Sequence, residues 1–168
     1  MAVVPASARP DPAPALHLAP PAAGDVARGV GRLLLRHDFV GIGEVPLPNG
    51  RRADLMAVDG RGRIAIVEIK VSRADLLGDG KWREYLEYCD VFYWAVPAGF
   101  ALDPFDDPAF APDLAGLIVA DRYDAAIARA AAEAPLAAPR RKVATLAFAR
   151  RAARRLIGHL DPDCEAGG

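Results

Sequence analysis

The stretch that decides the fold is "RADLMAVDGRGRIAIVEIKVS", residues 52–72. It predicts two strands, because runs rich in apolar residues flank the tight turn "DGRG". Apolar side chains occupy both parities of the second run, which is typical of a central strand covered on both faces. Among the charged residues of these strands, Asp54, Glu68 and Lys70 each stand between two apolar neighbours. Charged groups in such places are costly unless they are paired or have a chemical role.

The rest of the chain supplies helices and further strands around this pair. Apolar residues at helical spacing from Gly24 onwards predict a first helix over 24–38. We expect further helices over 72–90, with a break near Gly78–Gly80, and over 139–158, and a proline-rich loop over 98–113. The expected strands cover 40–48, 51–59, 62–71, 91–97, 116–121 and 125–131. This order predicts an α/β or α+β fold, a single domain in which helices flank a mixed sheet.

Composition limits the organisation and the location of the chain. Residues 1–23 contain six prolines and eight alanines, which predicts a disordered leader. The folded domain is expected over 24–160 and a flexible tail over 161–168. The sequence contains no apolar run near the roughly 20 residues that span a bilayer. Two distant cysteines and three scattered histidines argue against a zinc site or a disulfide framework, so a reducing cytoplasm is expected.

The charged residues of the two central strands are expected to lie close together. Asp54 and Glu68 stand at similar distances from the centre of the turn, which makes them near cross-strand neighbours. Glu68 and Lys70 project from one face of their strand, about 7 Å apart. Two carboxylates at that range repel each other unless a cation lies between them. Mg²⁺ or Mn²⁺ suits such a site and would activate a water for attack on a phosphoryl group, assisted by the lysine.

These residues also carry a family resemblance. Asp54 followed by Glu68-Ile69-Lys70 resembles the PD-(D/E)XK nuclease motif, and the order of elements resembles the restriction-endonuclease-like core. Several segments together are similar to the MmcB family of bacterial DNA repair proteins over residues 24–157. They are "RRADLMAV", "VEIKVSRADL", "KWREYLEYCD", "FYWAVP", "GLIVAD" and "RRKVATLAFARRAARRL". The resemblance implies a PD-(D/E)XK-like fold and a role in DNA repair.

The superfamily pattern implies a role for each matching residue. Asp54 and Glu68 would be metal ligands, together with the backbone carbonyl of Ile69, and Lys70 would be the catalytic lysine. Glu44 is a candidate additional acid, because many superfamily members supply one from the first helix or strand. An alanine stands where the motif has proline, at a position that varies in the superfamily.

Two further residues match the superfamily pattern, and the charged residues also have a structural interpretation. Lys81 and Tyr85 stand four apart on one expected helical face, and they resemble the Q-x-x-x-Y helix of some of these nucleases, with Lys in place of Gln. An ordinary amphipathic helix would give the same spacing. Asp54 could also pair with the arginines that precede it, and Glu68 with Lys70 could form a structural ion pair.

Charge is spread unevenly along the second half of the chain. The net charge of −1 excludes a uniformly basic coat, but residues 134–160 contain seven basic residues and no acid. Residues 101–133 contain seven acids and two arginines. The basic rows of the last helix either contact phosphates or pair with this acidic segment. The candidate nucleic-acid-binding residues are Arg51, Arg52, Arg150, Arg151, Arg154 and Arg155.

The sequence therefore predicts a metal-dependent deoxyribonuclease that acts in DNA repair, in the cytoplasm and associated with the nucleoid. We expect it to recognise DNA structure rather than sequence, because the chain has no obvious base-reading motif, and to have DNA repair protein partners. Two alternatives remain open. One is a catalytically inactive nuclease fold that binds DNA or recruits a partner. The other is an interaction domain that contacts proteins through the acidic loop 101–113.

Overall fold

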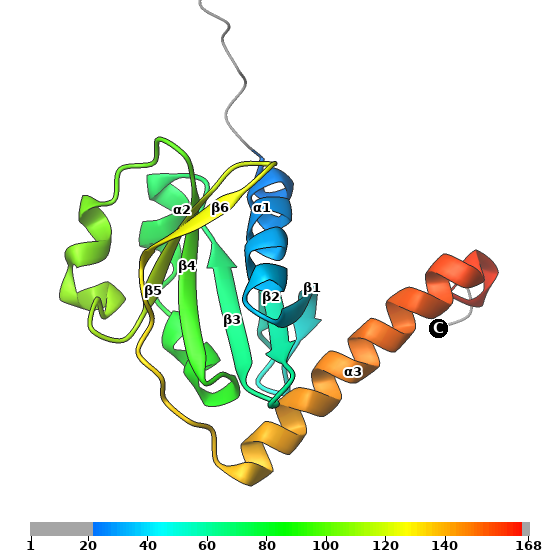
Figure 1. Cartoon of the computed structure of the whole chain (residues 1–168). Coiled ribbons are helices and arrows are strands. Elements are labelled where there is room, and N and C mark those ends of the chain that lie inside the picture. The colour runs from blue at the N-terminus through cyan, green and yellow to red at the C-terminus, as the bar shows by residue number, and fades with distance from the viewer. Residues whose placement is uncertain (1–21, 166–168) are drawn as a thin grey trace, which may run out of the picture.

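The computed structural model describes residues 22–165, in which six strands form one sheet with helical segments on both faces (Figure 1). The elements follow the order that the sequence predicts. They are α1 (Ala23–Arg36), β1 (Phe39–Pro46), β2 (Arg52–Asp59), β3 (Ile64–Ile69), α2 (Arg73–Gly78), the 3₁₀ helix η1 (Trp82–Tyr88), β4 (Val91–Pro97), the short η2 (Asp103–Asp106) and η3 (Pro108–Phe110), β5 (Gly116–Ala120), β6 (Ala125–Arg129), α3 (Ala138–Leu160) and η4 (Pro162–Glu165).

The strands lie in the sheet in their sequence order, β1-β2-β3-β4-β5-β6. β1, β2 and β3 form an antiparallel meander, β3 pairs parallel with β4 and β4 with β5, and β6 returns antiparallel to β5. The predicted mixed sheet flanked by helices is therefore confirmed. The ladder between β2 and β3 ends at the pair Leu55↔Val67, so Asp54 and Glu68 lie just beyond its last pair. This end of the ladder is where the candidate site lies.

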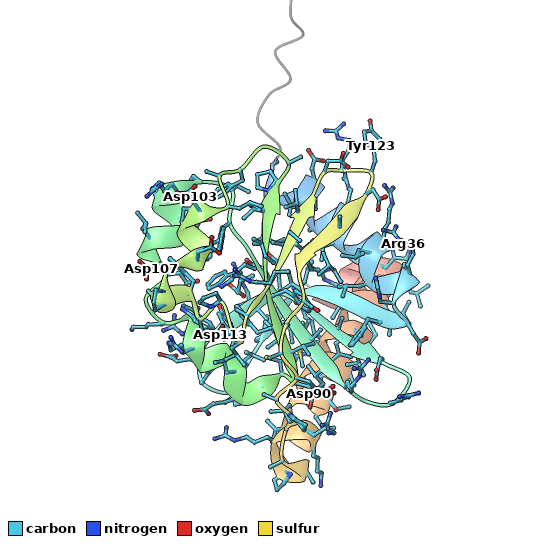
Figure 2. The ribbon with its side chains drawn as sticks, turned by 60° about the vertical axis from the view of Figure 1, so that its left-hand side comes forward. Arg36, Asp90, Asp103, Asp107, Asp113 and Tyr123 are labelled. Carbon is cyan, nitrogen blue, oxygen red and sulfur yellow. The ribbon has the colours of Figure 1, made fainter. Side chains whose placement is uncertain are left out.

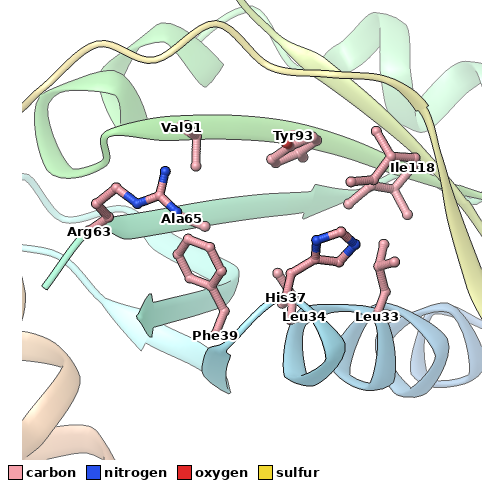
Figure 3. Close-up of a pocket in the computed structure, with 10 residues that line it drawn as sticks. Leu33, Leu34, His37, Phe39, Arg63, Ala65, Val91, Tyr93 and Ile118 are labelled. Carbon is pink, nitrogen blue, oxygen red and sulfur yellow. The ribbon is translucent and has the colours of Figure 1, made fainter. Parts of the chain in front are cut away.

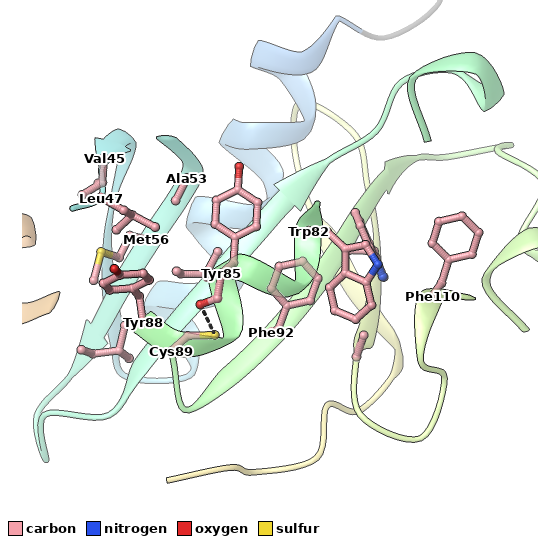
Figure 4. Close-up of a cluster of buried hydrophobic side chains, with 14 of the residues drawn as sticks. Val45, Leu47, Ala53, Met56, Trp82, Tyr85, Tyr88, Cys89, Phe92 and Phe110 are labelled. Carbon is pink, nitrogen blue, oxygen red and sulfur yellow. Dashed lines mark hydrogen bonds between the residues drawn. The ribbon is translucent and has the colours of Figure 1, made fainter. Parts of the chain in front are cut away.

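A separate hydrophobic core covers each face of the sheet. On one face α1 contributes Val26, Val30, Leu33 and Leu34. On the other face η1 and the η2–η3 segment enclose an aromatic cluster (Figure 4). β3 is buried at every position, which confirms a central strand covered on both sides.

The segment 72–90 differs from the predicted helix. It breaks near Gly78–Gly80 as expected, but its second half, η1, is a 3₁₀ helix. Trp82, Tyr85 and Tyr88 are all buried and stand three residues apart. The 3₁₀ repeat of three residues per turn aligns them on one face, toward the aromatic cluster, which a repeat of 3.6 would not do.

The predicted ends of the domain are only partly described. Residues 1–21 of the predicted leader lie outside the described residues, and α1 already begins at Ala23. η4 occupies the start of the predicted tail, whose residues 166–168 also lie outside them. Within residues 22–165, no helix is both long and apolar enough to cross a membrane.

α3 begins at the lower edge of the domain, and its C-terminal half projects beyond the sheet (Figure 1). Its first turns are held by Arg141, whose guanidinium donates to the buried Asp90 carboxylate at 2.7 and 2.8 Å. Asp90 also accepts from the backbone N–H groups of Ile64 and Leu136, near the start of α3 (Figure 2). Burial alone would raise the pKa of Asp90, but these hydrogen bonds, that from Arg141 first, lower it below its ordinary value. The acid therefore fastens α3 to the sheet.

Candidate active site

Asp54 and Glu68 lie side by side where the β2–β3 ladder ends. The Asp54 backbone N–H donates to Glu68 Oε1 at 3.1 Å, and the Ile69 backbone N–H donates to Asp54 Oδ2 at 2.8 Å. Each carboxylate thus binds a backbone N–H of the opposite strand, beyond the last ladder pair. Their second oxygens, Asp54 Oδ1 and Glu68 Oε2, accept no hydrogen bond from the described residues. The structure brings together the two acids that the sequence places on neighbouring strands.

The regular alternation of β2 breaks at Asp54. Ala53 belongs to the core beneath η1, whereas Leu55 belongs to the core beneath α1, although residues two apart in a regular strand share a face. On the neighbouring strand β1, Glu44 has a φ of 56°, in the left-handed region that non-glycine residues rarely adopt. Both strands are therefore irregular at the same level, and irregular backbone of this kind is concentrated at functional sites.

Burial makes both carboxylates hard to ionise. Burial is the main cause that raises the pKa of Glu68 to about 8, and the charge of Asp54 raises it further. Burial also raises the pKa of Asp54, although the Ile69 N–H and the charge of Lys70 oppose the shift. Near neutral pH, Glu68 therefore retains a proton unless a cation compensates its charge.

Lys70 lies between acids from two elements. Its Nζ is 2.8 Å from Asp79 Oδ2, and 3.9 Å from both Glu68 Oε2 and Asp75 Oδ1. Burial alone would lower the pKa of Lys70, but the hydrogen bond and charge of Asp79, with the charges of Glu68 and Asp75, raise it. The ammonium group is therefore held in its charged form, directed at Asp79.

Sequence reasoning missed Asp75 and Asp79. The available signal was a helix cap directly after β3: the Asp75 backbone N–H donates to the Ser72 Oγ at 3.1 Å, so α2 starts as soon as the strand ends. Because α2 is short and follows β3 directly, its acids stay close to the end of that strand. Asp79 stands between two glycines, at the position where the sequence predicts a break in the helix.

A groove of about 580 Å³ opens beside Asp54 and Asp75, whereas Glu68 and Lys70 are not among the residues that line it. Residues from α1, β1, β2, β3, α2 and α3 line it, including Arg28, Glu44, Asp54, Asp75 and Arg155. The groove therefore gives a ligand access to Asp54 and places positive and negative side chains along the approach.

Glu44 lies in this groove but has partners on α3. Its Oε2 is 3.5 Å from Arg151 Nη2 and 3.6 Å from Arg155 Nη2, and about half of the side chain is exposed. The candidate additional acid therefore faces the same space as Asp54, while its charge is compensated by arginines.

Lys81 and Tyr85 do not form the expected pair. Tyr85 is buried, its hydroxyl donates to the Arg52 carbonyl at 3.1 Å, and burial raises its pKa. Lys81 is exposed at the start of η1. Residues three apart share a face of a 3₁₀ helix, so Lys81 lies with Glu84 instead, and the α-helical spacing behind the predicted pair is absent.

The candidate DNA-binding arginines fall into separate groups. Arg51 pairs with Glu84 at 2.8 Å, whereas Arg52 is exposed. Arg150, Arg151 and Arg154 line a second groove of about 300 Å³, between α3 and the turn after β1. Arg155 lies in the groove beside Asp54.

The acidic segment does not neutralise the basic helix. The ion pairs of α3 go to Glu44, Glu87 and Asp90, none of which lies within 101–133. Asp103, Asp107 and Asp113 lie on the opposite side of the sheet from α1, over the η2–η3 segment (Figure 2). The pairing of these two segments that the sequence left open is therefore not observed among the described residues.

An apolar pocket of about 170 Å³ lies elsewhere, between the end of α1 and the sheet (Figure 3). Leu33, Phe39 and Ile118 line it, with His37 and Arg63. Arg63 is already bound by Asp59 at 2.7 Å, and no carboxylate lines the pocket. It lacks the groups that the chemistry expected from the sequence requires.

The donor set beside the groove fits one type of metal ion better than others. Within residues 22–165, no group of three or more His, Cys, Asp or Glu side chains is placed to hold an ion. Zinc prefers such groups of protein ligands. Mg²⁺ usually keeps several waters and takes only one or two carboxylates, completed by substrate phosphates. Asp54 and Glu68, each with one oxygen not engaged, fit that pattern.

Comparison with known proteins places this fold in a family. Residues 14–163 match the family described as DNA repair protein MmcB-like. The solved structure of the SPO1766 protein of unknown function from Silicibacter pomeroyi is 44% identical, with a TM-score of 0.75, and the match covers 88% of this chain and 96% of that one. No curated protein matches the chain. Because the matched region spans nearly all of the chain, the protein belongs to the MmcB-like family of DNA repair proteins.

Proposed function

We propose that this DNA repair protein is a metal-dependent DNA phosphodiesterase of the PD-(D/E)XK type, with its active site at the end of β2 and β3. One observation carries the proposal. Half-buried Asp54 lines an open groove and adjoins the buried Glu68, both carboxyl groups have raised pKa values, and the buried Lys70 lies 3.9 Å from Glu68. Groups with perturbed pKa values in a cleft are typical of catalytic sites.

Each residue has a role that follows from its position. Asp54, Glu68 and the Ile69 carbonyl would hold Mg²⁺ or Mn²⁺, which when bound polarises a phosphoryl oxygen and lowers the pKa of a bound water. Lys70, held in its charged form, would stabilise the negative charge that develops on the phosphoryl oxygens. Arg155 in the groove would contact the DNA backbone. Hydrolysis adds water across one P–O bond and yields a phosphate monoester and a hydroxyl group.

A second candidate function is a DNA-binding module without catalysis. It is favoured by the contacts that the side chains of the site already make within the protein. Each carboxylate accepts a backbone N–H, and Lys70 is closer to Asp79 than to Glu68. These contacts could hold the strand ends with no metal ion. The two functions differ in whether the acids bind a divalent cation.

A cleavage assay tests the first function. Purified protein is offered single-stranded, duplex, nicked, flapped and branched DNA with Mg²⁺, Mn²⁺ or EDTA. Lys70→Ala and Asp54→Asn should each lower the cleavage rate by at least about a hundredfold. Asp113→Asn, which removes an exposed acid far from the groove, should leave it unchanged. Cleavage that survives in both site variants would refute the site assignment.

Calorimetry separates the two candidates when no substrate is cut. Titration with Mn²⁺ should show one site in the wild type and in Asp113→Asn, and none in Asp54→Asn. A wild type that binds DNA with a steep salt dependence but takes up no Mn²⁺ would favour the non-catalytic module.

A further inference from the structure

The face of α3 that points away from the sheet has no partner in the described chain. Only Ala144 is buried among the residues of this helix. Its exposed large apolar residues include Leu146 at 52%, Leu156 at 59% and Leu160 at 74%. Apolar residues that gather on one face of a protein surface mark interaction sites.

Five exposed apolar residues of α3 follow a heptad spacing and form a seam along the helix. They stand three and four residues apart in turn, at Leu146, Ala149, Ala153, Leu156 and Leu160. All five side chains are exposed, because α3 contacts the domain through its other side, with Ala144 and with Arg151 directed at Glu44. The C-terminal half of the helix also projects beyond the sheet, which leaves this seam accessible (Figure 1). A 3-4 repeat of apolar residues is the surface on which a second helix packs.

Charge indicates the kind of helix that would pack there. The part of α3 from Arg150 to Leu160 contains four arginines and no acid. Arg150 and Arg154, one turn apart beside the seam, have no ion pair with any described residue. A second copy would bring together four arginines that have no ion pair with the described residues, Arg150 and Arg154 from each chain, which disfavours self-association. DNA phosphates would pair with the arginines but would leave the leucines in water.

We propose that the outward face of α3 binds an acidic amphipathic helix of another protein. The apolar residues of that helix would cover the seam, and its Asp or Glu residues would pair with Arg150 and Arg154. The surface is separate from the groove beside Asp54, so the proposal stands whether or not the protein cleaves DNA.

A peptide of this chemistry tests the proposal on the full chain. The probe is a fluorescent three-heptad peptide with Leu at a and d and Glu at e and g, and binding is followed by fluorescence anisotropy. Leu156→Ser combined with Leu160→Ser should weaken binding at least about tenfold. Leu35→Ser, which removes an equally exposed leucine from α1, should leave the affinity within about twofold of the wild type. Equal affinity of all three proteins would overturn the proposal.

Charge reversal tests the acidic character of the partner. Arg150→Glu combined with Arg154→Glu should weaken binding of the Glu peptide and strengthen binding of a matched peptide with Lys at e and g. Wild-type protein that binds both peptides equally would overturn the proposal, because the seam would then be indifferent to charge. A wild-type dimer in sedimentation equilibrium that Leu156→Ser with Leu160→Ser dissociates would also overturn it, since a second copy would then occupy the seam.

Discussion

The Glu68 carboxyl should make the fold less stable as the pH rises from 6 to 9. Burial, with the charge of Asp54, raises the pKa of Glu68 from 4.5 to about 8 in the native state. Between these values the native protein keeps a proton that the unfolded chain has lost. The contribution of Glu68 to the free energy of unfolding is therefore fully present below the unfolded pKa and is lost as the pH rises through about 8.

The size of the effect follows from the shift. One pKa unit corresponds to about 1.4 kcal/mol, so the shift from 4.5 to about 8 is worth at most about 5 kcal/mol over the whole titration. Between pH 6 and pH 9 the free energy of unfolding should fall by about 3 kcal/mol, because the unfolded glutamate is ionised throughout that range. Glu68→Gln cannot ionise, and its amide oxygen can still accept the Asp54 N–H. The variant should lack this fall and exceed the wild type in stability at pH 9.

Urea denaturation followed by tryptophan fluorescence measures this difference. The wild type, Glu68→Gln and the control Asp113→Asn are unfolded at each pH unit from 6 to 9, with EDTA present. Subtracting each variant from the wild type removes the contribution of the titrating groups that do not interact with the substituted residue. The Glu68→Gln difference should change by about 3 kcal/mol and the Asp113→Asn difference should stay flat. If the difference in free energy of unfolding between the wild type and Glu68→Gln stayed flat with pH, Glu68 would be ionised throughout this range. The electrostatic reasoning behind the site would then be wrong.

Three further changes have defined outcomes. Asp90→Asn removes the buried charge that fastens α3, and should lower the free energy of unfolding by about 3 kcal/mol in urea denaturation; a loss below about 1 kcal/mol would contradict that role. Gly29→Ala would press a Cβ against backbone carbonyls of the β5–β6 turn and should lower thermal stability, whereas Gly31→Ala, in open space on the same helix, should raise it by up to about 1 kcal/mol. Asp79→Asn should lower the pKa of Lys70, measured by NMR of ¹³C-lysine in a chain with only three lysines, and an unchanged value would exclude Asp79 as its main partner.

The fold could be predicted because its signals are local. The "DGRG" turn fixes the pairing of β2 with β3, and the buried run of β3 identifies the central strand. The same register places Asp54 opposite Glu68 just beyond the last ladder pair, although the regular alternation of β2 breaks at Asp54. The closeness of the two central acids could therefore be predicted from about twenty residues of sequence.

The remaining features depend on contacts between distant segments. Glu44 is compensated by Arg151 and Arg155 only because α3 crosses β1, and no local pattern specifies that crossing. The 3₁₀ repeat of η1 directs aromatic residues three apart into the aromatic cluster. This arrangement depends on the packing of η1 against β4, which lies outside the local sequence. The hydrogen bond between Lys70 and Asp79 likewise requires the loop after α2 to fold back over the end of β3.

The balance of charge at the end of β3 separates the two interpretations of these residues. Well-packed apolar residues often replace a structural ion pair without loss of stability. Here Lys70 is surrounded by three carboxylates, from Glu68, Asp75 and Asp79, and Asp54 adds a fourth to the group. Protonation of Glu68 removes one negative charge and leaves three acids to one lysine. The proposed uptake of a divalent cation would compensate this excess of negative charge, which a structural ion pair alone leaves unexplained.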